Sequence, residues 1–127
     1  MSTIRFSRRA LLAGVTAAAA IGATTHPAFA AELKIGVDLS LTGGTDDFGK
    51  GSRMGIELAT NEFNADGGYK GQKVELVIYD DETKPAKGVE NVTRLITRDR
   101  VCAIIGPANS GVALAVIDIA QKQKIPL

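Results

Sequence analysis

Apolar residues follow a regular order from residue 33 onward. They occupy every second position in 33–39 (LKIGVDL) and again in 73–80 (KVELVIYD), which predicts two β-strands. The segment 101–105 (VCAII) is apolar throughout, which predicts a third strand that is buried on both faces and central in its sheet. The segment 125–127 (IPL) is interpreted as the beginning of a fourth strand.

Helical spacing of apolar residues separates these strands. After a glycine-rich loop at 42–51, a helix is predicted from about Ser52, and Gly67-Gly68 ends it. The residues that form its apolar stripe are Gly55, Leu58, Ala59 and Phe63. This spacing places the Phe63 ring in the core.

Two further helices are predicted after the second and third strands. One begins at Pro85, which loses no hydrogen bond in a first turn, and carries Val89, Val92, Leu95 and Ile96. The other carries Ala113, Val116, Ile117 and Ala120 on one face. Strands alternating with helices predict an α/β fold, a three-layer sandwich with a parallel sheet. Because the second strand alternates as an edge strand does, the expected strand order is 2-1-3.

The amino-acid composition argues against several classes of function. Lysine plus arginine (15) nearly equals aspartate plus glutamate (14), so no basic surface indicates a nucleic-acid partner. A chain with 1 histidine and 1 cysteine is not expected to hold a metal centre or a catalytic Cys/His pair. No cofactor is expected either. Cys102, inside the third predicted strand, is interpreted as a small buried hydrophobic residue.

Residues 1–30 have the features of a cleavable signal peptide. Three arginines precede an apolar run at 10–23, and the triplet Ala28-Phe29-Ala30 follows as a cleavage site. Ser7-Arg8-Arg9 resembles the start of a twin-arginine export signal, although the general secretory route stays open because its signals also contain paired arginines. We therefore expect residues 31–127 to form the mature part, exported to the periplasm as a soluble protein with no stable membrane insertion after cleavage.

One edge of the predicted sheet carries the candidate chemistry. The strand ends at Ser40, Asp80 and Gly106 are expected to form a rim where ligands of parallel sheets bind. The carboxylates of Asp80 and Asp81 are interpreted as hydrogen-bond acceptors for turn N–H groups. A general acid/base pair is the disfavoured alternative, because no nucleophile or histidine accompanies them.

The third predicted helix begins about four residues after Gly106. Free N–H groups at a helix start, together with the Ser110 hydroxyl, favour binding of a carboxylate. Asn109 or Ser110 acting only as the helix cap is the alternative.

The mature part resembles the first lobe of the periplasmic branched-chain-amino-acid-binding proteins, the leucine/isoleucine/valine receptors of ATP-driven importers. The stretches that carry the resemblance are KIGV with LTG (34–43), FG with GIELA (48–59), NADGG with GQKVEL (64–76), and YDD with IIGPANSG (79–111). No one stretch is diagnostic, but their order and spacing are specific.

The resemblance implies a non-enzymatic solute-binding component that delivers branched-chain or related amino acids, or amides, to a membrane permease. It implies that Ser110, with Asn109 and Gly111, binds the α-carboxylate of the ligand. Phe48 corresponds to an aromatic that often contacts the ligand side chain, with a packing role as the alternative. It also implies a two-lobe cleft, of which these residues are an incomplete first lobe, so the chain by itself is not expected to bind an amino acid.

Two other functions are compatible with parts of this sequence pattern. A sensory lobe of the same fold that signals to a membrane receptor is open, because a fold does not determine its partner. A dinucleotide-binding enzyme is disfavoured, since the glycines at 49–55 follow the first strand by about nine residues and have the wrong spacing for a pyrophosphate loop.

Overall fold

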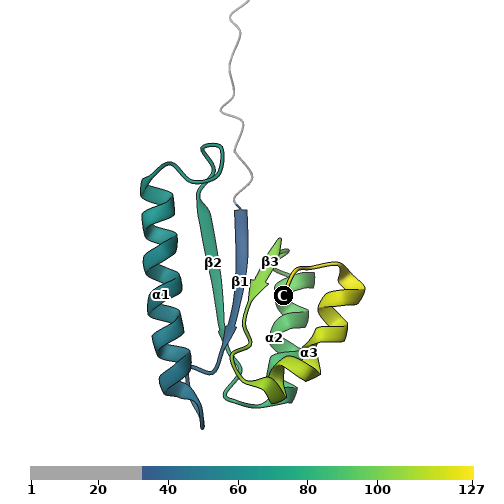
Figure 1. Cartoon of the computed structure of the whole chain (residues 1–127). Coiled ribbons are helices and arrows are strands. Elements are labelled where there is room, and N and C mark those ends of the chain that lie inside the picture. The colour runs from purple at the N-terminus through teal and green to yellow at the C-terminus, as the bar shows by residue number, and fades with distance from the viewer. Residues whose placement is uncertain (1–32) are drawn as a thin grey trace, which may run out of the picture.

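The computed structural model describes residues 33–127, in which three strands alternate with three helices (Figure 1). The elements are β1 (Leu33–Leu39), α1 (Asp46–Ala65), β2 (Val74–Asp80), α2 (Pro85–Thr97), β3 (Ala103–Ile105) and α3 (Ser110–Gln123). The predicted signal peptide and its predicted cleavage site lie outside the described residues. None of the helices within 33–127 combines the length and the hydropathy needed to cross a membrane.

The sheet is parallel, with the order β2-β1-β3, which confirms the predicted fold class and strand order. β1 pairs with β2 along its whole length, from Leu33 opposite Val74 to Leu39 opposite Asp80. The pairing of β1 with β3 covers only 35–37. The prediction that the third strand is central is wrong for the described sheet, where β1 has that place.

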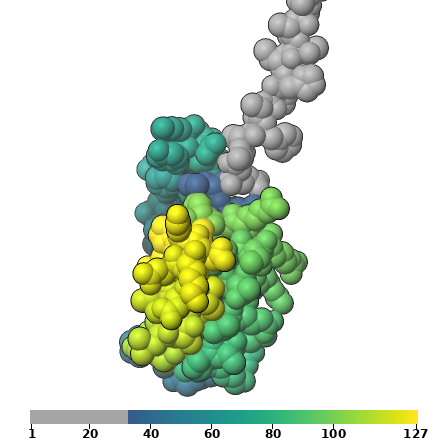
Figure 2. All heavy atoms as spheres, turned by 90° about the vertical axis from the view of Figure 1, so that its right-hand side faces the viewer, coloured from purple at the N-terminus to yellow at the C-terminus, as the bar shows by residue number. Residues whose placement is uncertain are grey.

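The helices form the outer layers. α1 lies on one side of the sheet, and α2 and α3 lie together on the other (Figures 1 and 2). The main core fills the space between the sheet and the α2–α3 pair. The residues of its buried cluster are Val92, Leu95, Val101, Ile104 and Val116.

β3 is covered on one face only. Ile104 is buried in the core, whereas 41% of Ile105 is exposed, because α1 contacts β1 and β2 rather than β3. The prediction of a strand buried on both faces is therefore wrong. Cys102 is exposed, with its thiol 3.2 Å from the Lys34 carbonyl oxygen, so its interpretation as a buried residue is also wrong.

The segment 125–127 has not formed a strand, but it approaches β3. The Ile104 N–H donates to the Pro126 carbonyl oxygen over 2.9 Å. This is the only bond of that kind between the two segments in the described part of the chain, so the interpretation as the start of a strand has partial support.

α1 differs most from its prediction. It begins at Asp46 rather than near Ser52, so part of the glycine-rich loop is helical. Phe63 is 45% exposed instead of lying in the core. Gly49 is the one residue of α1 that is buried, and it packs against the backbone of Ser40, the residue that follows β1.

Candidate functional site

All three helices begin at the same edge of the sheet, just beyond the carboxyl ends of the strands (Figure 1). Three connections lie on this rim: 40–45, 81–84 and 106–109. The rim is the place where parallel α/β sheets bind ligands. The predicted placement of Ser40, Asp80 and Gly106 is confirmed.

Asp80 holds the first connection against the second. Its Oδ1 accepts from the backbone N–H groups of Leu41, Thr42 and Glu82 at 2.9, 3.2 and 2.9 Å, and its Oδ2 accepts from the Thr42 hydroxyl at 2.7 Å. Partial burial raises the pKa of Asp80, but these bonds together outweigh burial and hold the pKa below its usual value. The Asp80 carboxylate therefore accepts hydrogen bonds from turn N–H groups, as the sequence predicted.

Asp81 makes the same kind of link from a fully buried position. Its Oδ1 accepts from the Ser40 hydroxyl at 2.5 Å and from the Thr83 N–H at 2.7 Å. Thr83 in turn accepts from the Thr45 N–H at 3.3 Å through its hydroxyl oxygen. These two connections therefore form one cross-linked platform at the rim.

Phe48 projects from the first turn of α1. The neighbouring Gly49 packs so tightly that a Cβ there would lie 1.9 Å from the Ser40 carbonyl oxygen. The Phe48 side chain is 76% exposed, so it does not plug a gap in the described part of the fold. An exposed aromatic on a rigid helix start is available to a ligand at the rim.

The start of α3 combines the residues predicted to bind a carboxylate. Asn109 is the N-cap, and its Oδ1 accepts from the N–H groups of Gly111 at 2.9 Å and Val112 at 3.3 Å. Capping by Asn109 is thus confirmed, and it occupies two of the donors expected to be free. What remains is the exposed Ser110, with its N–H at the first helical position, and the amide N–H₂ of Asn109.

A buried polar pair behind the rim escaped the sequence analysis. Asp38, in the middle strand, is fully buried, and its Oδ1 accepts from Asn91 Nδ2 at 2.8 Å. Asn91 Nδ2 also donates to the Asp80 carbonyl oxygen at 2.9 Å. The alternation in 33–39 assigned Asp38 to the non-apolar face of its strand, and α2 and α3 bury that face. Only the unusual presence of a carboxylate in an otherwise apolar strand end hinted at it.

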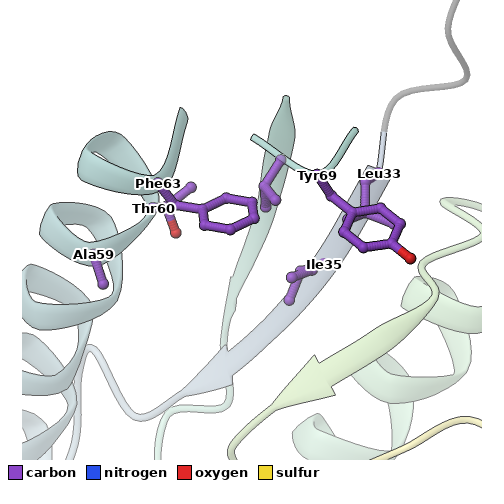
Figure 3. Close-up of a pocket in the computed structure, with 7 residues that line it drawn as sticks. Leu33, Ile35, Ala59, Thr60, Phe63 and Tyr69 are labelled. Carbon is purple, nitrogen blue, oxygen red and sulfur yellow. The ribbon is translucent and has the colours of Figure 1, made fainter. Parts of the chain in front are cut away.

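A hollow lies at the end of the sheet opposite the rim. The rings of Phe63 and Tyr69 lie near the start of β1, where Leu33 and Ile35 line the same space (Figure 3). Its volume is about 380 Å³ and its lining is almost wholly apolar. It has few groups to orient a polar ligand. The rim remains the better candidate for a polar ligand, and no cluster within 33–127 is placed to hold a metal ion.

Comparison with known proteins gives consistent matches. Residues 32–127 match the periplasmic binding protein family. The Leu/Ile/Val-binding protein homolog 2 of Brucella abortus is 36% identical over 114 residues, which are 88% of this chain and 29% of that protein.

Two solved structures show the same fold. The branched-chain amino acid substrate-binding protein LivJ of Streptococcus pneumoniae, in complex with isoleucine, is 34% identical with a TM-score of 0.74, over 76% of this chain and 28% of that one. A solute-binding protein of Rhodopseudomonas palustris, in complex with 3,4-dihydroxybenzoic acid, is 28% identical with a TM-score of 0.69, over 75% and 26%. The chain thus spans less than a third of the length of these relatives.

Proposed function

The chain belongs to the periplasmic binding protein family, and from that premise we propose that it forms part of the first lobe of an extracytoplasmic solute-binding protein. The protein captures branched-chain or related amino acids and delivers them to the permease of an ATP-driven importer. Its role is binding rather than catalysis. The proposal includes export of residues 31–127 to the periplasm.

The geometry at the start of α3 carries this proposal. Ser110 is exposed at the rim and offers a hydroxyl and a helix-start N–H, both of which donate to anions. Asn109 accepts from the N–H groups of Gly111 and Val112 with its Oδ1, and its own amide N–H₂ is a further donor at the same helix start. The cap therefore orders the loop and leaves a small set of donors for one carboxylate.

The ligands of the two related structures support a carboxylate at this site. Isoleucine and 3,4-dihydroxybenzoic acid differ in size, charge and aromaticity, but each carries a carboxylate. A lobe that holds the shared group while other residues select the rest of the ligand fits both. Phe48, exposed at the rim, is our proposed contact for the apolar part of the ligand.

Substitution of Ser110 by alanine tests the assignment in the complete gene product that contains this chain. A hydrogen bond to a charged group contributes roughly 1.5–3 kcal/mol. Since about 1.4 kcal/mol is a factor of ten, affinity measured by calorimetry is expected to fall about ten- to a hundredfold. Thr93→Ala, which removes an exposed hydroxyl from α2, is the matched control and is expected to leave affinity unchanged.

Thermal melting of the ligand-free protein separates binding from capping. Because Asn109 supplies the cap, Ser110→Ala is expected to leave the melting temperature nearly unchanged. A lowered melting temperature with affinity within twofold of wild type means that Ser110 has a structural role and that the site assignment is wrong.

A further inference from the structure

Asp38 is a carboxylate in the core layer between the sheet and the α2–α3 pair. It follows Gly36 on the same face of β1, where a Cβ on Gly36 would contact Leu95 and Val101. Its Oδ1 is bonded to Asn91, but its Oδ2 is buried with no hydrogen-bond partner among the described residues. A buried polar atom without a partner is costly, and a charged one is more so.

The unpartnered oxygen lies where α2 and α3 meet. A Cβ at Gly88 of α2 would stand 3.4 Å from Asp38 Oδ2 and 2.2 Å from a methyl group of Val112 in α3. Gly88 therefore lets the two helices close over the carboxyl group. Val112 is in the first turn of α3, two residues after Ser110, so the packing of this carboxyl group and the position of the candidate site are linked through one rigid turn.

The surroundings favour the neutral carboxyl group. Burial raises the pKa of Asp38 to about 7; the Asn91 hydrogen bond opposes the rise, and the negative charges of Asp81 and Asp80 add to it. From the helices, α2 presents Gly88 and Asn91, and α3 presents the apolar Val112. Near neutral pH, a small change of pH therefore converts Asp38 between its protonated and its ionised form.

We propose that Asp38 is a proton-dependent latch that holds the first turn of α3, and with it the candidate ligand site, against α2 and the sheet. With the proton bound, no charge lies in the seam and the helices stay closed over it. When the proton leaves, the charged oxygen requires water or a donor, and the seam between Gly88 and Val112 opens to admit one. The consequence for ligand binding rests on the proposed function, whereas the latch itself does not.

Nuclear magnetic resonance on the complete gene product tests the latch without ligand. Selective ¹³Cγ labelling of aspartate reports each carboxyl group, and Asp38→Asn identifies the signal of Asp38 by its loss. We expect that signal to titrate with a midpoint near pH 7, and the amide signals of Gly111 and Val112 to shift with the same midpoint. In Asp38→Asn the amide shifts at that midpoint are expected to vanish.

Two further variants make the result specific. Asn91→Leu removes the donor to Asp38 Oδ1, so the midpoint of the Asp38 titration is expected to move to higher pH. This variant replaces Asp38→Asn as the test if Asp38→Asn does not fold. Asp118→Asn, on the exposed surface of α3, is the matched control and is expected to leave the amide titration unchanged. Amide shifts of Gly111 and Val112 that do not follow the Asp38 titration, or that persist in Asp38→Asn, overturn the latch.

A ligand measurement distinguishes failure of the latch from failure of the proposed function. If both hold, affinity for the amino acid is expected to fall as pH rises through 7 in wild type but not in Asp38→Asn. If the amide titration is observed while Ser110→Ala leaves affinity unchanged, the latch stands and the site assignment fails. If Ser110→Ala weakens binding while the amides do not titrate, the latch alone is wrong.

Discussion

The close approach of α1 to the end of β1 leads to a prediction with opposite signs at two nearby glycines. Gly49 and Gly51 are both helical, and alanine is better than glycine in a helix interior by about 1 kcal/mol. At Gly51 no atom lies within 4 Å of an added Cβ, so Gly51→Ala is expected to raise the free energy of unfolding by about 0.5–1 kcal/mol.

At Gly49 the same gain in helix propensity is outweighed. An added Cβ would lie 1.9 Å from the carbonyl oxygen of Ser40 and 2.6 Å from its carbonyl carbon, and these backbone atoms cannot rotate away. Overpacking costs typically about 1–3 kcal/mol, and a backbone clash favours the upper end. Gly49→Ala is therefore expected to be about 1–2 kcal/mol less stable than wild type.

Urea denaturation of the two variants beside wild type measures both effects. Because helix propensity is common to both, the difference between the variants isolates the clash and is expected to reach about 3 kcal/mol. If Gly49→Ala is as stable as Gly51→Ala, α1 does not pack on β1 as described, and the placement of Phe48 at the rim fails with it.

Two other predictions concern the rim and the predicted signal peptide. Asp80→Ala removes the acceptor that joins two connections of the platform and is expected to lower the free energy of unfolding by about 1–2 kcal/mol at pH 7, since the carboxylate is only partly buried. Folding lowers the pKa of Asp80, so the stabilisation by its carboxylate is fully present above pH 3.8 and is lost as the pH falls through the lowered pKa. The free energies of unfolding of variant and wild type are therefore expected to converge in acid. A difference between them that stays constant with pH contradicts this role of Asp80. Periplasmic material is expected to begin at Ala31 by intact mass, and joint replacement of Arg8 and Arg9 by lysine is expected to stop export; normal export of that variant favours the general secretory route.

The sequence predicted the parts of the fold that depend on local pattern. The alternation in 33–39 and 73–80 was enough to predict β1 and β2, and α2 begins at Pro85, where a missing N–H has no cost. The strand order followed from the alternation of the second strand, which predicted an edge position for it. Asn109, Ser110 and Gly111 are neighbours in the chain, so a helix start after a strand end was enough to place them together at the rim.

The predictions that failed concern residues whose environment depends on how the helices pack on the sheet. Glycines weaken a helix in isolation, so the sequence predicted a loop where α1 in fact begins, and the close approach of Gly49 to Ser40 appears only in the folded structure. Periodicity placed Phe63 on the apolar stripe of its helix but did not reveal that the described residues leave it half exposed. Asp38 and Asn91 are 53 residues apart, and their pairing follows only from the packing of α2 on β1.

The central claim is that the start of α3 holds the carboxylate of the ligand. Calorimetry on the complete gene product, with a panel of amino acids and the carboxamide of each, tests it directly because the two series differ only at that group. Loss of a charged hydrogen-bonding partner predicts that each carboxamide binds about ten- to a hundredfold more weakly than its free acid. Equal affinity for an amino acid and its carboxamide would contradict the claim.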